Sequence, residues 1–319
     1  MKCLCCGKAI SDHAFTVEKE WCWHKKCVKS FFQTDELPLL DITKEQLEKL
    51  ANKTVNEGFT VPGVQKKLSL HLSSDTNARL TIVDYPTGFI LKPQTEEYAH
   101  MPEYEDLAMR LAELIGIQTV PHALIKMKGE YGYITKRIDR DITQDQIKLY
   151  AMEDFCQLSN RLTQDKYKGS YENCGRIIKK YSITPGLDLS ELFLRVAGSF
   201  VMGNSDMHLK NFSLRETEPG SRRFQLSKAY DMLPVNVIMP EDQEQLALTI
   251  NGKKRNIHKK EFKVLADMCG VPENAAEHMI KKLCALKEKM LQLIDQSYLS
   301  ELEKGKVRTL IMERIEILE

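Results

Sequence analysis

The spacing of hydrophobic side chains along this chain changes near residue 150. Before that point apolar and polar residues alternate in short runs, which predicts strands over 66–73, 79–85 and 89–92. Two further predicted strands, "HALIKMK" and "YGYITKRI", flank a glycine turn. The region is therefore predicted to be a mostly antiparallel sheet with one helix. The apolar face of that helix consists of Leu107, Leu111, Leu114 and Ile115.

After residue 148 the apolar positions follow a helical period. Helices are predicted over 151–162 and over 188–204, the second with Asp188 at its start in a capping-box-like position. The segment 259–319 predicts three more helices. We expect these helices to form one packed bundle around the loop 204–213.

The change of pattern and a cysteine-rich beginning divide the chain into three predicted segments. Residues 1–45 are a zinc-knuckle segment, 46–148 a β-rich lobe and 149–319 a helical lobe. A linker is expected to lead from the first segment into a short helix whose N-cap is Asp41 or Thr43. The predicted fold class is α+β, with an antiparallel β-rich lobe followed by a helical lobe.

Composition limits the partners that this chain can take. Its 319 residues carry 46 basic and 45 acidic side chains, a formal net charge of +1. A nearly neutral chain has no electrostatic signature of nucleic-acid or membrane-surface binding. The sequence has no run of about 18 apolar residues and no recognisable signal peptide. We therefore expect a cytoplasmic protein without membrane contact.

Five of the nine cysteines lie within the first 27 residues, which favours a metal site over disulfides in a chain without an export signal. The spacing is C-x2-C, then 17 intervening residues, then H-x2-C. Two such pairs can surround Zn²⁺ tetrahedrally, and four protein ligands make the site structural. Cys5 and Cys22 are nearby competitors for a ligand position. The predicted ligands are Cys3, Cys6, His24 and Cys27.

The stretch "VMGNSDMHLKNFSL" contains a possible phosphoryl-transfer site. Asp206 and Asn211 have the spacing at which a kinase catalytic loop places a carboxylate for the incoming hydroxyl and a carboxamide for Mg²⁺. Asp231 follows 20 positions after Asn211 and offers a second oxygen ligand. Lys92 ends an apolar strand and can reach phosphates, although alone it also fits an edge residue with its amine in solvent. The joint order of these parts is that of a two-lobed kinase.

Seven pieces of the sequence together resemble one family. They are "GVQKKLSL", "FILKP", "RIDR", "EDFCQL", "GNSDMHLKNFSL", "AYDMLP" and "LALTINGK". The chain is similar, from about residue 55 to 310, to the HipA family of bacterial serine/threonine kinases, the toxins of HipB-type toxin–antitoxin systems. The resemblance implies a kinase-like fold with a cleft for ATP between a small β-rich lobe and a large helical lobe.

The resemblance assigns roles to residues of the catalytic loop and its surroundings. It implies that Asp206 is the catalytic aspartate, that Asn211 and Asp231 bind Mg²⁺, and that Lys92 contacts the ATP phosphates. His208 and Lys210 lie in the same matched loop, where Lys210 can neutralise charge that develops on the phosphoryl group.

The turn "PGVQKK" matches the phosphate-binding loop of the family. From the residues alone a glycine before a strand can admit an anion, although a hairpin turn is the simpler interpretation. Glu105, rather than the nearby Glu103, is the candidate acid to pair with Lys92. The family has a self-phosphorylated serine three residues before the loop glycine, and here Thr60 holds that position. The nucleotide-binding residues implied for this turn are Gly63, Val64, Gln65 and Lys67.

The expected function is that of a protein kinase that uses ATP and Mg²⁺, with Zn²⁺ in a structural role. The resemblance implies a HipB-like helix-turn-helix antitoxin as partner, DNA association only through that antitoxin, and a protein target such as an aminoacyl-tRNA synthetase. The chain resembles a short form that lacks a first subdomain, which a separate small protein or the zinc knuckle could replace. A nucleotide-binding pseudokinase and a zinc-knuckle adaptor are the alternatives.

Overall fold

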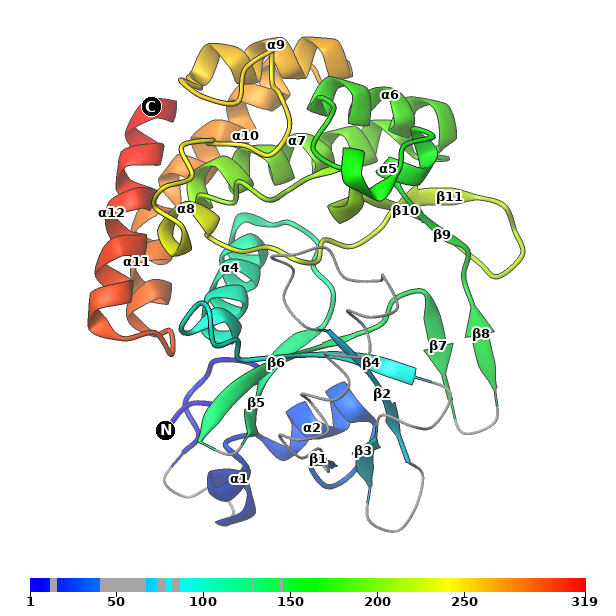
Figure 1. Ribbon diagram of the computed structural model, residues 1–319, viewed down its shortest axis with the longest axis vertical. Helices are drawn as coiled ribbons and strands as arrows, with labels where there is room; N and C mark the ends of the chain where they lie inside the picture. Colours follow the sequence, from blue (N-terminus) through cyan, green and yellow to red (C-terminus); the bar gives the residue numbers. More distant parts are fainter. Residues whose placement is uncertain (12–15, 41–66, 74–77, 82–86, 128, 144–145) are drawn as a thin grey trace. The chain divides into compact units, whose positions relative to one another are not determined.

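The computed structural model describes residues 1–11, 16–40, 67–73, 78–81, 87–127, 129–143 and 146–319. The chain forms two compact units (Figure 1). Unit 1 comprises residues 1–106 and 121–148, and unit 2 comprises residues 107–120 and 149–319. None of the helices in these described ranges is long and apolar enough to cross a membrane.

Unit 1 is built on a six-stranded sheet of order β1-β3-β2-β4-β6-β5. The pair β1 and β3 is parallel and the other pairs are antiparallel. This confirms the predicted, mostly antiparallel sheet. The strands are β1 (Leu39–Leu40), β2 (Leu68–Leu72), β3 (Arg79–Thr81), β4 (Thr87–Pro93), β5 (His122–Met127) and β6 (Glu130–Lys136). A separate two-stranded sheet joins β7 (Arg140–Ile142) to β8 (Ile147–Leu149).

Strand β4 lies in the middle of the sheet and positions Lys92. Its register with β6 places Leu91 opposite Ile134 and Lys92 opposite Tyr133. Leu91 and Ile134 are fully buried, as are several other apolar side chains of the sheet. Lys92 is 3% exposed on this central strand, so it is not an edge residue with its amine in solvent.

The cysteine-rich segment packs on this sheet. It contains α1 (Thr16–Trp21) and α2 (Lys25–Phe32), and α2 lies against the sheet in Figure 1. The ring centroids of Phe31 and Phe32 lie 5.9 and 5.2 Å from that of Phe89 on β4. Trp23 is fully buried beside both phenylalanines. The backbone N–H of Leu124 on β5 donates to the carbonyl oxygen of Leu4 at 3.1 Å. The segment is therefore part of the core of unit 1.

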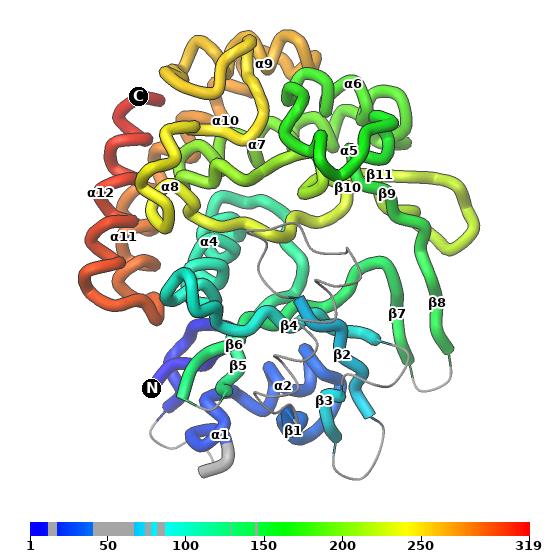
Figure 2. Tube along the Cα trace, in the orientation of Figure 1, coloured from blue at the N-terminus to red at the C-terminus, as the bar shows by residue number. Residues whose placement is uncertain are grey.

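Unit 2 is mostly helical, and its path can be followed in Figure 2 from green to red. Its central helix, α7 (Pro185–Met202), packs against α6, α9, α10 and α12. The helix α4 (Met101–Ile115) belongs to unit 2 from residue 107 onward. The other helices are α5 (Phe155–Leu158), α6 (Tyr171–Tyr181), α8 (Val235–Ile238), α9 (Lys259–Cys269), α10 (Glu273–Ala285), α11 (Lys287–Asp295) and α12 (Glu301–Leu318).

Two predicted helix boundaries in this unit are wrong. The run 151–162 is not one helix, because Met152–Asp154 forms strand β9 and only Phe155–Leu158 is helical. Asp154 caps α5 in a capping box with Gln157, and the D-x-x-Q spacing was the signal for that start. β9 pairs with β10 (Ser213–Glu216), which also pairs with β11 (Phe224–Leu226).

The second correction concerns α7 and the C-terminal segment. α7 begins at Pro185, so Asp188 lies in its first turn and does not cap it. The carboxylate of Asp188 instead accepts hydrogen bonds from the Ser182 hydroxyl at 2.6 Å and the Leu226 amide at 2.8 Å. The segment 259–319 forms four helices where three were predicted, because its apolar pattern runs on through the short break between α10 and α11.

Candidate functional site

In unit 1 the side chains of Lys92 and Glu105 form a buried ion pair. The ammonium of Lys92 donates to Oε1 of Glu105, and the exposed fractions of the two side chains are 4% and 0%. The Lys92 amine also lies 5.4 Å from the centroid of the Tyr133 ring, which attracts its charge. Glu105 is the acid that the sequence favoured over Glu103. A charge buried this deeply requires a partner, so the pair fixes the lysine.

The predicted catalytic-loop segment of unit 2 begins where α7 ends. Gly203 closes the helix with a φ of 70°, a left-handed conformation that glycine adopts without strain. The Asp206 amide donates to Oδ1 of Asn204 at 3.2 Å, and Nδ2 of Asn211 donates to the Asp206 carbonyl at 2.8 Å. These bonds hold the backbone of the loop. The side chain of Asp206 is 39% exposed.

Asn211 and Asp231 suit a hard cation. Because the Asn211 amide nitrogen is used inside the loop, its carbonyl oxygen is the atom left to face an ion. Asp231 has a φ of 61° and follows Tyr230, whose hydroxyl donates to the Lys210 carbonyl at 3.2 Å. Carboxamide and carboxylate oxygens are ligand types that Mg²⁺ takes. The Tyr230 hydrogen bond ties the Asp231 segment to the loop.

His208 is held as a neutral imidazole. Burial lowers its pKa from 6.5 to about 4, against the opposing effect of the Asp206 carboxylate. Its Nε2 lies 3.8 Å from Oδ1 of Asp206. The neutral ring therefore shapes the loop without adding a charge beside the carboxylate.

Lys210 points to strand β9. Its ammonium lies 2.7 Å from Oδ2 of Asp154, and its side chain remains 35% exposed. Asp154 therefore has two partners, because its other carboxylate oxygen, Oδ1, caps α5. The pair connects the loop to β9 and keeps the cation of Lys210 at the surface of the site.

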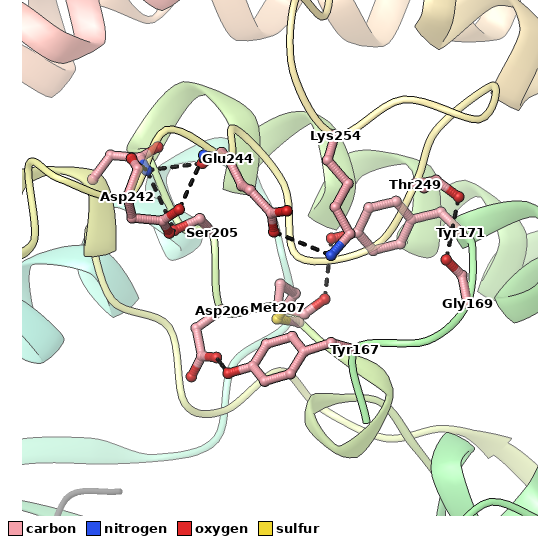
Figure 3. Close-up of polar contacts among 11 residues, drawn as sticks. Tyr167, Gly169, Tyr171, Ser205, Asp206, Met207, Asp242, Glu244, Thr249 and Lys254 are labelled. Carbon is pink, nitrogen blue, oxygen red and sulfur yellow. Dashed lines mark hydrogen bonds and ion pairs between the residues drawn. The ribbon is translucent and has the colours of Figure 1, made fainter. Parts of the chain in front are cut away.

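A second set of hydrogen bonds supports the loop from the segment 236–244 (Figure 3). The Ser205 hydroxyl donates to Oδ2 of Asp242 at 2.6 Å. The Asn236 amide donates to the carbonyls of Asp242 and Glu244 at 3.2 and 2.9 Å. Arg314 on α12 donates to Oδ1 of Asn236 at 3.2 Å. The loop is thereby held by side chains from the C-terminal half of unit 2.

The predicted phosphate-binding turn mostly lies outside the described residues. Lys67 is described, and it is exposed. Its neighbours in the predicted turn, together with the predicted phosphosite, are outside the described ranges. These residues are Thr60, Gly63, Val64 and Gln65.

The predicted zinc ligands converge in unit 1. One ligand atom from each of Cys3, Cys6, His24 and Cys27 lies within 4.8 Å of the others. Nδ1 of His24 is 3.4 Å from Sγ of Cys6 and 3.8 Å from Sγ of Cys27. These separations fit the edges of a tetrahedron with Zn–S near 2.3 Å and Zn–N near 2.0 Å, roughly 3.6 Å.

A further contact selects the nitrogen that would bind the metal. Nε2 of His24 lies 3.2 Å from the carbonyl oxygen of Ala9. A proton on Nε2 for this bond leaves the lone pair on Nδ1, which is the usual way a metal-binding histidine is oriented. The backbone N–H of His24 also donates to Sγ of Cys3 at 3.4 Å. Cys5 and Cys22, the competitors, are outside the cluster.

Three residues of these sites were not found from the sequence. Tyr133 and Asp154 contact the two predicted lysines, and the hydroxyl of Tyr167 donates to Oδ1 of Asp206. The capping-box spacing could have drawn attention to Asp154. The tyrosines are brought to their sites by folding and carry no signal in the sequence.

The fold and these sites define a class. A small, mostly antiparallel β unit with a buried Lys–Glu pair and a helical unit with an Asp-x4-Asn loop correspond to the protein-kinase-like fold. The structure is similar to HipA from the HipA–HipB–operator DNA complex of Shewanella oneidensis, with a TM-score of 0.68, 18% identity, and coverage of 85% of this chain and 70% of that one. It is also similar to the Helicobacter pylori proinflammatory kinase CtkA, with a TM-score of 0.54, 16% identity, and coverage of 79% and 93%.

The sequence comparison then gives the family. The family model of the HipA-like C-terminal domain matches residues 59–290, and the chain belongs to that family. The chain is 23% identical to a "Putative kinase" of Haemophilus influenzae, over 77% of each chain. It is 31% identical to "Putative kinase Y4dM" of Sinorhizobium fredii, over 65% of this chain and 53% of the relative. It thus spans about half the length of that relative.

Proposed function

We propose that this chain is a HipA-type serine/threonine protein kinase that uses ATP and Mg²⁺. The observation that carries the proposal is the loop in which Asn211 is bonded to the backbone of Asp206 while the Asp206 side chain stays 39% exposed. Membership of the HipA-like family supports it. So does the buried pairing of Lys92 with Glu105, the arrangement that positions a phosphate-binding lysine in kinases.

The residues have separate roles in the proposed transfer. Asp206 accepts the hydrogen bond of the acceptor hydroxyl and orients it toward the phosphoryl group. Lys92 contacts the ATP phosphates, and Asn211 and Asp231 hold Mg²⁺. When bound, the ion neutralises charge on the phosphate oxygens. Lys210 is the additional cation beside the loop.

The proposed regulation and partners follow from the relatives. Thr60 is the proposed self-phosphorylation site, where a phosphate adds about −1.5 to −2 charge to a phosphate-binding turn and opposes nucleotide binding. Because the S. oneidensis neighbour was solved with HipB and operator DNA, we propose a HipB-like antitoxin as partner and DNA association only through it. A protein target, possible examples being aminoacyl-tRNA synthetases, completes the proposal.

We further propose that Zn²⁺ occupies the Cys3-Cys6-His24-Cys27 cluster in a structural role. The four ligand atoms and the Ala9 contact to His24 support this assignment. Four protein ligands leave no position open for a reactive water.

The test is mass spectrometry of the purified chain incubated with Mg²⁺-ATP, beside Asp206→Asn and the control Asp165→Asn. Asp165 is a carboxylate of the same unit that pairs with Lys168 at 2.7 Å and lies outside the loop. We expect phosphate on the Thr60 peptide in the parent and in Asp165→Asn, and none in Asp206→Asn. Nucleotide binding without transfer would indicate a pseudokinase. If the chain neither binds nucleotide nor transfers phosphate, the zinc-knuckle adaptor is the remaining alternative.

A further inference from the structure

The carboxylate of Asp206 already accepts a hydrogen bond from another hydroxyl of the chain. The Tyr167 side chain points at Asp206, and its Oη donates to Oδ1 (Figure 3). The backbone of the loop does not depend on this bond, because Asn204 and Asn211 hold it. Tyr167 therefore engages the carboxylate, the part of Asp206 that a phosphoryl acceptor would use.

The chemistry of the two contacts is the same. In a kinase the catalytic aspartate accepts a hydrogen bond from the acceptor hydroxyl before transfer. The phenol of Tyr167 is a hydroxyl that donates to the same group. A carboxylate can accept more than one hydrogen bond, but a substrate serine or threonine that approaches Oδ1 along the direction of the Tyr167 hydrogen bond competes with the phenol for that position.

The surroundings keep Tyr167 in this position and keep it protonated. Its ring meets the His208 ring edge-on, with the centroids 5.0 Å apart. The amines of Lys166 and Lys254 lie 5.0 and 5.9 Å from its centroid. Burial, followed by the charge of Asp206, raises the pKa of the Tyr167 phenol far above its usual value. The phenol is therefore a proton donor at any physiological pH.

The Tyr167 side chain has room to rotate away from Asp206. Its side chain is not enclosed, since 41% of the residue is exposed. It follows the short 3-10 helix η1 (Thr163–Asp165), and the carbonyl of its neighbour Lys166 accepts a bond from the Leu209 amide at 3.1 Å. The backbone there is fixed while the side chain faces solvent, so a rotation of the side chain is enough to free Asp206.

We propose that Tyr167 is a specificity-determining residue that occupies the acceptor position of Asp206 until a bound substrate displaces it. The inference rests on the proposed kinase function. It predicts that water and weakly bound hydroxyls are poor acceptors, because they lack the additional binding energy needed to displace the phenol. A protein substrate that binds elsewhere on the chain supplies that energy.

The test compares Tyr167→Phe with the parent and with Tyr181→Phe. Tyr181 is a matched control, because it is 39% exposed and has the amine of the preceding Lys180 4.7 Å from its ring centroid. We expect Tyr167→Phe to hydrolyse ATP faster in the absence of protein acceptor, by a factor on the order of ten, since a hydrogen bond to a charged group is lost. With dephosphorylated casein as acceptor, KM for casein should fall while kcat and KM for ATP stay unchanged. Tyr181→Phe should match the parent.

The opposite kinetic result overturns the inference. If Tyr167→Phe lowers kcat and leaves KM for casein unchanged, the phenol orients Asp206 for catalysis and is a positioning residue. Equal rates in the parent and Tyr167→Phe would also reject it, since no competition exists.

A second readout separates this inference from the kinase proposal. In protein labelled with ¹³C at the tyrosine Cζ, the resonance missing from Tyr167→Phe identifies Tyr167. It should shift in Asp206→Asn, where the acceptor charge is lost. If the resonance shifts but the parent transfers no phosphate above Asp206→Asn, the proposed function has failed although the contact exists. If the parent is active and the resonance does not shift, the inference alone has failed.

Discussion

The polar clusters of the two units are held in different ways. In unit 1 three thiols and an imidazole converge, and Lys92 and Glu105 face each other inside an apolar core. In unit 2 the loop around Asp206 is fixed by a network of ordinary hydrogen bonds within the loop, to the end of α7 and to the segment 236–244, where Arg314 of α12 holds Asn236. Unit 1 thus contains a buried charge pair and a proposed metal site. The loop of unit 2 depends on many small contacts.

This difference predicts how each region fails. Removal of one partner from the clusters of unit 1 leaves uncompensated charge or unliganded thiols in the interior, and the loss of stability is large. Removal of one hydrogen bond from the loop of unit 2 leaves the others in place, and the loss is small.

The largest effect is expected from loss of the metal. Cys27→Ser removes a proposed zinc ligand, and metal binding supplies about 10 kcal/mol or more of folding free energy in small zinc domains. Both tryptophans of the chain, Trp21 and Trp23, lie in this segment. Intrinsic tryptophan fluorescence therefore reports the knuckle alone. We expect a red shift of the emission and loss of zinc by elemental mass spectrometry.

Cys5→Ser is the matched control, because Cys5 is a thiol of the same segment outside the ligand cluster. It should keep one zinc per chain and the parent emission. A parent protein that contains no zinc, and whose emission does not respond to a chelator, would contradict the proposed metal site.

The next largest effect concerns the buried ion pair. Lys92→Met leaves the Glu105 carboxylate in the core without its cation, which should lower the free energy of unfolding by about 3–5 kcal/mol. The double variant Lys92→Met/Glu105→Leu should recover most of that stability without restoring nucleotide binding. Denaturant unfolding measures the stability of the single and the double variant. Lys126→Met, at an exposed position of β5, is the control. A single variant as stable as the parent would mean that the pair does not constrain the sheet.

The fold was predictable where one local pattern decides it. Short alternating or β-branched runs predicted β2 to β6, and the helical spacing of Leu107, Leu111, Leu114 and Ile115 predicted α4. The strands β1, β7 and β8 were not predicted. The prediction of one helix over 151–162 is wrong because the apolar residues of this run belong to two elements. Met152 lies in β9, while Phe155 lies in α5 and stacks on Phe212. Periodicity cannot divide a run between two elements whose partners come from distant parts of the chain.

Sequence-based prediction of the candidate sites has the same limit. C-x2-C and H-x2-C are local spacings, and the structure brings their four residues together. The Asp-x4-Asn spacing likewise locates the loop. Tyr167 reaches Asp206 from 39 positions away, and no sequence signal marks a contact that depends on how the segment after η1 lies beside the loop. What the sequence lacks are the long-range contacts that orient each local motif.

A smaller effect is expected from the titration of His208. Its folded pKa of about 4 lies below the ordinary 6.5, so the unfolded chain binds a proton between these values that the folded chain does not. This contribution to stability is therefore fully present above pH 6.5 and decreases as the pH falls toward 4. We expect a loss of about 2 kcal/mol between pH 7 and pH 5.

The measurement is urea unfolding of the parent and His208→Gln at both pH values. The groups that act on the ring electrostatically are Asp206, Lys166 and Asp231. His208→Gln should lose the part of the pH dependence that comes from this ring. An unchanged dependence would mean that the imidazole is not excluded from solvent in the folded chain.

The smallest effect separates backbone strain from crowding at the start of the loop. Gly203 and Gly220 have φ values of 70° and 73°, so an alanine at either position is strained by about 1–2 kcal/mol. A Cβ at Gly203 would lie 2.3 Å from Cδ2 of Leu310 on α12, whereas a Cβ at Gly220 would meet nothing within 4 Å. We expect Gly203→Ala to be less stable than Gly220→Ala by about 1 kcal/mol, since the Leu310 side chain is flexible and can move aside. Thermal unfolding of the two variants measures the difference. Equal losses would show that α12 yields completely to a side chain at Gly203, and that the loop of unit 2 is held by its hydrogen bonds without a contribution from steric fit.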